Sequence, residues 1–274
     1  MLTNKKFINA KYPQYFAPEI KAFKKQLHYS KQEGRTKFLI EGRHEETDDS
    51  LPPNFYELRR EGENENQICK LIRNDMIDEF IVYVNKHNVS IDSSIKDSIY
   101  ETNCFLIKNQ IISGTDRISY LNRLTPIKYA AFFGSIQIFK YLKLNGADLS
   151  PSIWLYAIHG HNAEIIHLLE EDNIKSQDDA SYLDYYLESI KCHHNDIANY
   201  FLNNFFQSND ENLLQFTLVH SLKCYNFAFI EDSLIKEQLF ILCKYDYSIL
   251  VDILMKNFDV KLNSKMVTDN TIHN

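Results

Sequence analysis

Two short runs, one with two histidines and one with a cysteine and two histidines, contain residue types that could bind a metal ion. The first is His159-Gly160-His161, and the second is Cys192-His193-His194, one helical segment further along. Imidazole and thiolate are usual protein ligands of zinc, so a zinc site built from these two runs is one interpretation. The preferred interpretation is a structural or surface role at helix ends, and we expect no bound metal.

Catalytic motifs do not stand out elsewhere in the sequence. The chain contains no nucleophile elbow, phosphate-binding glycine loop, H-E-x-x-H motif or paired-carboxylate arrangement that would indicate a known reaction. The single tryptophan, Trp154, is expected in the core rather than in a ligand site. We therefore expect a non-enzymatic protein that needs no cofactor.

The cysteines and the hydropathy pattern indicate a reducing compartment. The cysteines are odd in number and form no C-x-x-C pair, which favours free thiols over a disulfide framework. No N-terminal run is apolar enough for a signal peptide, and no stretch reaches the roughly 18 apolar residues of a membrane span. We expect a soluble, cytoplasmic protein. The cysteines are Cys69, Cys104, Cys192, Cys224 and Cys243.

The elements that must position the histidines and cysteines are helical pairs, and residues 124–149 (LTPIKYAAFFGSIQIFKYLKLNGADL) give the clearest example. Thr125 suits a helix cap and Pro126 a first helical position, while glycines suit the two helix ends. This pattern resembles an ankyrin repeat, a unit of about 33 residues with the signature T-P-L-H-x-A. A histidine beside the turn is ordinary in such repeats. The residues that carry the signature are Thr125, Pro126, Ala130, Ala131, Gly134, Gly146 and, in the next unit, Gly160.

Degraded copies of the unit follow along the chain. They begin near residues 152, 189, 221 and 240, and an upstream hairpin over 68–84 turns at Asn74-Asp75. His193 and Tyr225 stand where a turn glycine is expected, which predicts turns with some strain or with a different geometry. The short interval from Gly134 to Gly160 predicts short or missing β-hairpin fingers. The stretch 109–126 is longer than the pattern and predicts a loop or a distorted repeat.

Together these features predict an all-α fold, an ankyrin-repeat solenoid of stacked helical hairpins with a partly helical N-terminal extension. The predicted divisions are a basic helical extension (1–43), an acidic linker or strap (44–66), the repeat array (67–265) and a C-terminal tail (266–274). The extension carries ten Lys and Arg against three Asp and Glu, and the strap carries eight acidic residues against two basic ones. A basic arm can grip nucleic acid or an anionic membrane, but the acidic strap and the net charge of −7 disfavour both.

Longer stretches resemble one particular family. The segments ICKLIRNDMIDEFIVYVNKHNVS (68–90), IYETNCFLIKNQ (99–110), YAAFFGSIQIFKYLKLNGADL (129–149) and SIWLYAIHGHNAEIIHLLEE (152–171) are similar to a large family of ankyrin-repeat proteins from parasitic protists of the trichomonad kind. Residues 41–66 resemble the stretch that precedes the ankyrin-like domain in that family. The resemblance implies an uncharacterised repeat protein that binds another protein, and it offers no activity or catalytic residue.

The resemblance also implies where a partner would bind, since residues just before the turn glycine face the concave groove of ankyrin repeats. We expect one or more protein partners to bind there, whether the chain acts as a scaffold or as a recruiting adaptor of a ubiquitin ligase or effector complex. Two alternatives stay open: Phe132 and Phe133 could pack internally, or the acidic strap could cover the two lysines. The expected contact residues are Phe132, Phe133, Ile158, His159, Lys191, Cys192, Lys223 and Cys224.

Overall fold

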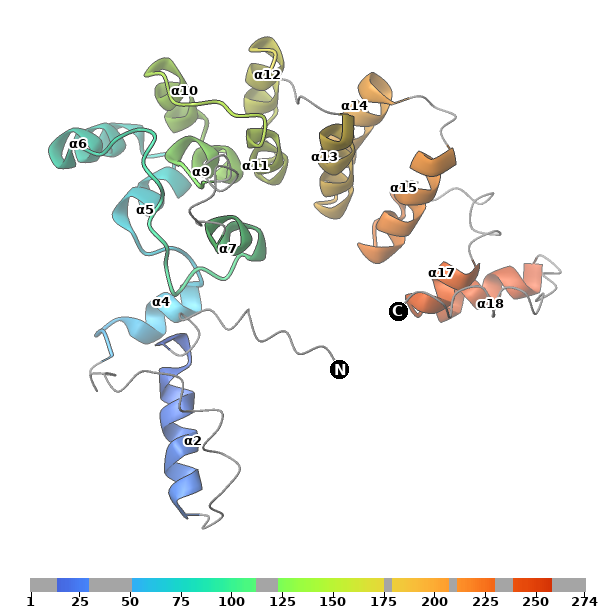
Figure 1. Ribbon diagram of the computed structural model, residues 1–274, viewed down its shortest axis with the longest axis horizontal. Coiled ribbons are helices and arrows are strands. Elements are labelled where there is room, and N and C mark those ends of the chain that lie inside the picture. Colours follow the sequence, from blue (N-terminus) through green and yellow to red (C-terminus); the bar gives the residue numbers. More distant parts are fainter. Residues whose placement is uncertain are drawn as a thin grey trace. The chain divides into compact units, whose positions relative to one another are not determined.

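The computed structural model describes residues 14–29, 51–111, 123–174, 179–206, 211–229 and 239–257, and within these ranges it contains helices and no strand (Figure 1). This confirms the predicted all-α class. None of the described helices is long and apolar enough to cross a membrane. The helices are α2 (Ala17–Tyr29), α4 (Phe55–Glu61), α5 (Gln67–Arg73), α6 (Ile77–His87), α7 (Cys104–Ile111), α9 (Pro126–Phe133), α10 (Ile136–Leu144), α11 (Ile153–Gly160), α12 (Ala163–Glu171), α13 (Asp179–Lys191), α14 (Asn195–Phe205), α15 (Glu211–Lys223), the 3₁₀ turn η1 (Phe227–Phe229), α17 (Leu239–Lys244) and α18 (Ser248–Asn257).

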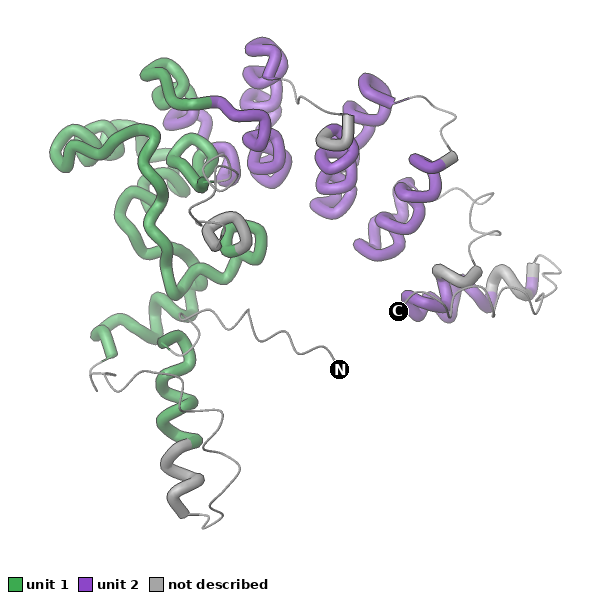
Figure 2. The backbone as a smooth tube through the Cα atoms, viewed as in Figure 1, with its two compact units in different colours: residues 1–130, 140–148 green, residues 131–139, 149–274 purple. Residues whose placement is uncertain are grey.

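The chain forms two compact units, which Figure 2 shows in different colours. One unit consists of residues 1–130 and 140–148, and the other of residues 131–139 and 149–274. The division passes through α9 and α10, which is the segment with the clearest repeat signature. The repeat array predicted over 67–265 includes residues of both units.

The acidic segment before α5 is part of the first unit's core and not a bare linker. Phe55 and Leu58 of α4 are buried and pack with Tyr100, because α4 is amphipathic enough to place both side chains on one face. Asn64 is fully buried and its side-chain amide donates to the carbonyl oxygen of Lys96. Residues 51–66 therefore include a helix with buried side chains, within the segment 44–66 that the sequence predicted as an acidic linker or strap. Residues 44–50, most of the basic extension and the tail at 266–274 lie outside the described residues.

The hairpin predicted over 68–84 is present as α5 and α6, which pack on each other. Asp75 makes the turn between them with a left-handed backbone (φ +49°), which confirms the turn predicted at Asn74-Asp75. Arg73 ties this hairpin to the rest of the first unit, since its guanidinium donates to the Tyr129 hydroxyl at 2.9 Å. Residues 112–122, which form most of the predicted loop or distorted repeat at 109–126, lie outside the described residues.

Most of the repeat signature in residues 124–149 has its predicted local structure. Pro126 is the first residue of α9, and Gly134 and Gly146 take left-handed backbones (φ +67° and +84°) where α9 and α10 end. The Thr125 cap is the exception. Its backbone carbonyl accepts from the Tyr129 N–H, but among the described residues its buried hydroxyl has no hydrogen-bond partner.

Gly160 differs from the prediction, because it does not make the turn after α11. It is the last residue of α11, and His161 takes the left-handed position (φ +46°). The glycine is needed for a different reason: a Cβ atom at Gly160 would lie 2.0 Å from the carbonyl oxygen of Ala131. Both Ala130 and Ala131 are fully buried, so small residues allow two helices to approach closely at this point.

The second unit continues as successive helical hairpins. The helices pack as the pairs α11 with α12, α13 with α14, and α17 with α18, while α11, α13 and α15 contact one another in succession. The turns are closed by left-handed residues that are not glycine, namely His161, His193, Tyr225 and Asp246. This confirms the prediction of strained turns at His193 and Tyr225, because L-residues with a side chain enter this region at a cost.

Candidate functional site

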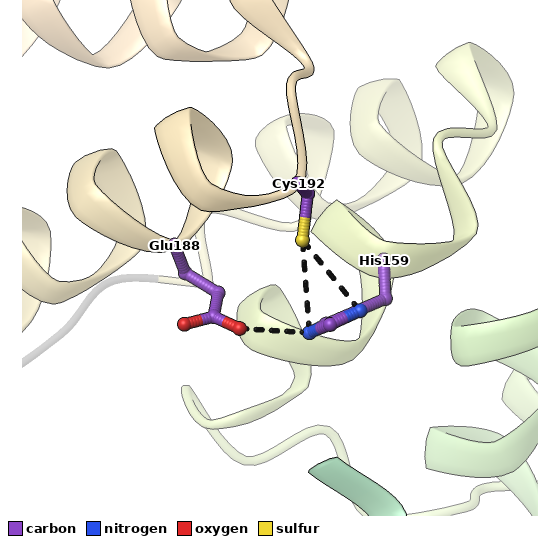
Figure 3. Close-up of side chains that lie close together, drawn as sticks. All are labelled: His159, Glu188 and Cys192. Atoms are coloured by element: carbon purple, nitrogen blue, oxygen red, sulfur yellow. Dashed lines mark hydrogen bonds and ion pairs between the residues drawn. The ribbon is translucent and has the colours of Figure 1, made fainter. Parts of the chain in front are cut away.

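Three side chains of different chemistry meet where α11 lies against α13 (Figure 3). His159 lies in the last turn of α11, Glu188 lies on α13, and Cys192 follows the last residue of α13. The His159 Nε2 atom is 2.9 Å from Glu188 Oε1, and the Cys192 Sγ atom is 3.6 Å from His159 Nδ1. Because residues four apart share one face of a helix, Glu188 and Cys192 approach the histidine together.

The charges of this cluster are set by burial and by hydrogen bonds. Burial alone would raise the pKa of Glu188, but hydrogen bonds from His159 and Lys191 outweigh it and hold that pKa at about 2. The Lys191 Nζ atom lies 2.6 Å from Glu188 Oε1. Burial, together with the Glu188 carboxylate, raises the pKa of the Cys192 thiol to about 12. Without a metal, Cys192 is therefore a protonated thiol at neutral pH and not an activated nucleophile.

The other histidines singled out by the sequence point elsewhere. The rings of His161 and His194 are stacked 3.9 Å apart, and His161 Nε2 lies 3.0 Å from Asp196 Oδ1. Burial and the nearby His161 lower the pKa of His194. His193 Nε2 lies 3.0 Å from the backbone carbonyl oxygen of Cys224. Of the two runs proposed as zinc ligands, only His159 and Cys192 belong to the cluster.

Sequence reasoning missed Glu188, which completes the cluster. The available signal was its position four residues before Cys192 in a segment that reads as helix. That spacing places a carboxylate and a thiol on the same helical face.

The predicted contact residues of α9 and α11 are more buried than a binding surface requires. Phe132 is only 9% exposed and stacks on the His159 ring at a centroid distance of 5.0 Å, whereas Phe133 is half-buried. Ile158 is fully buried, so its assignment as a contact residue is wrong. The error follows from the turn: because His161 and not Gly160 is left-handed, the positions equivalent to Lys191-Cys192 are His159-Gly160.

The predicted contact residues of α13 and α15 lie on a partly exposed face that repeats. Lys191 and Lys223 are exposed, and Cys192 and Cys224 are half-buried. On each helix, exposed and half-buried residues recur at intervals of three and four, on one face. Phe216, 54% exposed, lies on this face and was missed by the sequence reasoning. We call this set the first-helix face: Asp184, Leu187, Glu188 and Lys191 on α13, and Phe216, Val219, His220 and Lys223 on α15.

The candidate site is thus the histidine–glutamate–cysteine cluster together with the adjoining first-helix face. No protein-family model, no curated protein and no solved structure matches this chain.

Proposed function

We propose that this chain is a non-catalytic scaffold of the ankyrin-repeat type that binds another protein through its first helices. The T-P signature before α9, the left-handed turns and the succession of α11, α13 and α15 support a repeat array. Arrays of this kind use extended surfaces built from equivalent positions of successive repeats.

The observation that carries the proposal is the repetition of the first-helix face. Each of its four positions on α13 has an equivalent on α15, and the outer two are exposed while the inner two are half-buried on both helices. The opposite faces are buried, with Ser189 and Ile190 equivalent to Ser221 and Leu222. A partner can therefore lie across two adjacent helices that expose equivalent positions.

The chemistry of this face favours a partner segment with apolar anchors beside acidic groups. Phe216 offers a large exposed apolar surface. Leu187 and Val219, which occupy equivalent positions of the first-helix face on α13 and α15, are half-buried. Lys223 supplies positive charge at the C-terminal end of α15, whereas Lys191 at the end of α13 is already paired with Glu188. Aromatic residues that become buried on binding dominate interface energies, and complementary charges direct the association.

Capture of partners with the full chain tests the proposal. We expect the double variant Phe216→Ala/Lys223→Glu to lose most of the partner retrieved by the wild type after cross-linking. Both residues are exposed, so the variant should remain folded. Ile249→Ala is the matched control, because Ile249 is 75% exposed on α18 and outside the first-helix face. Equal partner yields from the wild type and the double variant would contradict the proposal.

A second candidate is the recruiting adaptor, which needs another docking surface. Ile20 and Phe23 on α2 are 37% and 53% exposed, which favours such a surface. In that case Ile20→Ser/Phe23→Ser should lose one set of partners while Phe216→Ala/Lys223→Glu loses a different set. If the two double variants lose the same set or neither loses any, the adaptor proposal is wrong.

A further inference from the structure

The cluster of His159, Glu188 and Cys192 has the composition and the dimensions of a metal site. One ligand atom from each residue can be chosen so that all three lie within 4.8 Å of one another. Zinc bonds of about 2.0 Å to nitrogen or oxygen and 2.3 Å to sulfur place tetrahedral ligands about 3.3 to 3.6 Å apart. The His159 Nε2 atom is 2.9 Å from Glu188 Oε1 and 3.8 Å from Cys192 Sγ. The first distance is shorter and the second slightly longer than these values, so the two bracket the spacing that a bound zinc ion requires.

We propose that His159 Nε2, a Glu188 carboxylate oxygen and Cys192 Sγ together bind one Zn²⁺ ion. Imidazole, carboxylate and thiolate are all zinc ligands, whereas a thiolate disfavours Mg²⁺ and Ca²⁺. Three protein ligands leave a fourth tetrahedral position for water or for a group from a partner. The His159 and Glu188 side chains are each 17% exposed, so the position can be reached from solvent.

Of the two helix pairs, α11 with α13 and α13 with α15, only the first carries this set of three ligands. At the next pair, α13 and α15, the equivalent positions hold Lys191, His220 and Cys224. A lysine there replaces the histidine ligand, and an ammonium group has no lone pair to offer a metal. Among the described hairpins, no other set of His, Cys, Asp and Glu side chains comes close enough to hold an ion.

Binding has a defined balance of charge. The Cys192 thiol releases its proton to solvent as the Zn–S bond forms, and the His159 proton resides on Nδ1 so that Nε2 offers its lone pair. Glu188 is already ionised and keeps its carboxylate charge. The Lys191 Nζ atom lies 2.6 Å from Glu188 Oε1, so its positive charge offsets part of the negative charge that the carboxylate and the thiolate bring to the site. The ion then joins α11 to α13, and with them two successive hairpins.

Cobalt substitution of the full chain, freed of affinity tags and chelator-treated, tests the site. We expect Co²⁺ to bind at about one equivalent with a thiolate-to-metal charge-transfer band and the strong visible bands of tetrahedral cobalt, and Zn²⁺ to displace it. The variants Cys192→Ser, Glu188→Gln and His159→Gln should each weaken binding about 10-fold or more, with Cys192→Ser also abolishing the charge-transfer band. Cys224→Ser, at the equivalent position of the next hairpin, is the matched control and should bind like the wild type.

The wild-type titration decides the proposal even if a variant fails to fold. Absence of a charge-transfer band at stoichiometric Co²⁺, or a band that disappears in Cys224→Ser and persists in Cys192→Ser, would overturn the site. Elemental analysis of the purified protein that finds copper in place of zinc would overturn the choice of metal. Zinc should also raise the unfolding temperature of the wild type by several degrees, because it binds only the folded site, and should raise that of Cys192→Ser by less.

Discussion

Replacement of Gly160 by alanine separates two physical explanations for this glycine. Gly160 ends α11 with an ordinary backbone, since only Gly62, Gly134 and Gly146 are left-handed among the described glycines. If local propensity alone mattered, alanine would stabilise the helix by up to about 1 kcal/mol. The structure predicts the opposite sign, because the new Cβ atom would meet the Ala131 carbonyl oxygen at 2.0 Å.

The size of the effect follows from the movement that is required. A carbon and a carbonyl oxygen in contact lie at least about 3.3 Å apart, so α11 must move by roughly 1 Å from Ala131. The Gly134 nitrogen, 3.0 Å from the new Cβ atom, restricts the direction of that movement. Overpacking of this kind costs about 1–3 kcal/mol. After subtraction of the gain in propensity, we expect Gly160→Ala to lose up to about 2 kcal/mol in free energy of unfolding.

Tryptophan fluorescence provides a local assay. Trp154, the only tryptophan, lies on α11 itself, is 4% exposed and donates from Nε1 to the Ile174 carbonyl at 2.7 Å. Selective excitation of this residue during urea unfolding reports the stability of the hairpin that holds Gly160. We expect a lower urea midpoint for Gly160→Ala than for the wild type.

The control is Gly146→Ala, which tests backbone strain without a steric clash. Gly146 is left-handed (φ +84°), and a Cβ atom there meets nothing within 4 Å. Gly146→Ala should lose about 1 kcal/mol in free energy of unfolding through backbone strain alone. Gly160→Ala, in contrast, has an unstrained backbone and loses stability only through the steric clash. A Gly160→Ala protein as stable as the wild type, or more stable, would refute the packing argument.

Three further predictions concern buried polar groups and turns. Asn226→Ala should lose about 2 kcal/mol in urea unfolding, because the buried Asn226 amide donates to the Ile190 carbonyl and to Asn195 Oδ1, both at 2.8 Å; an unchanged midpoint would contradict this. Tyr225→Gly should gain about 0.5–1 kcal/mol by relieving a left-handed backbone (φ +59°), and a loss of stability would show that the turn is not strained. Burial lowers the pKa of Lys128 from 10.5 to about 8, which destabilises the fold below pH 8 and ceases to do so as the pH rises toward 10.5. Lys128→Met should thus be about 1–3 kcal/mol more stable than the wild type at pH 7 and lose this advantage near pH 10, a trend measurable by unfolding at both pH values.

Local patterns in the sequence predicted the helices and most of their ends. The hairpin of α5 and α6, the first helical position of Pro126 and the left-handed turns at Gly134 and His193 depend on neighbouring residues. Spacing of apolar residues, proline geometry and glycine at helix ends are local signals, and they sufficed there.

The missed features depend on contacts between residues far apart in the chain. The sequence pattern assigns Gly160 to a turn, but a glycine is needed there because the Ala131 carbonyl oxygen lies too close for a Cβ atom. Local spacing does not reveal this contact. The acidic composition of residues 51–66 predicted a strap, but Phe55 and Leu58 bury enough apolar surface to fold that segment onto Tyr100. Glu188 belongs to the candidate site because α13 packs against α11, which carries His159.

The pair α11 and α13 and the pair α13 and α15 differ in the charge of one equivalent side chain. This difference relates the metal proposal to the binding proposal. Between α11 and α13, the Glu188 carboxylate balances the positive partners around it. Between α13 and α15 the equivalent residue is His220, whose pKa is lowered first by burial and then by Lys223. Its buried Nε2 atom has no hydrogen-bond partner among the described residues. A carboxylate supplied by a partner would pair with the exposed Lys223, so we expect the acidic group of a bound segment to lie over the C-terminal end of α15.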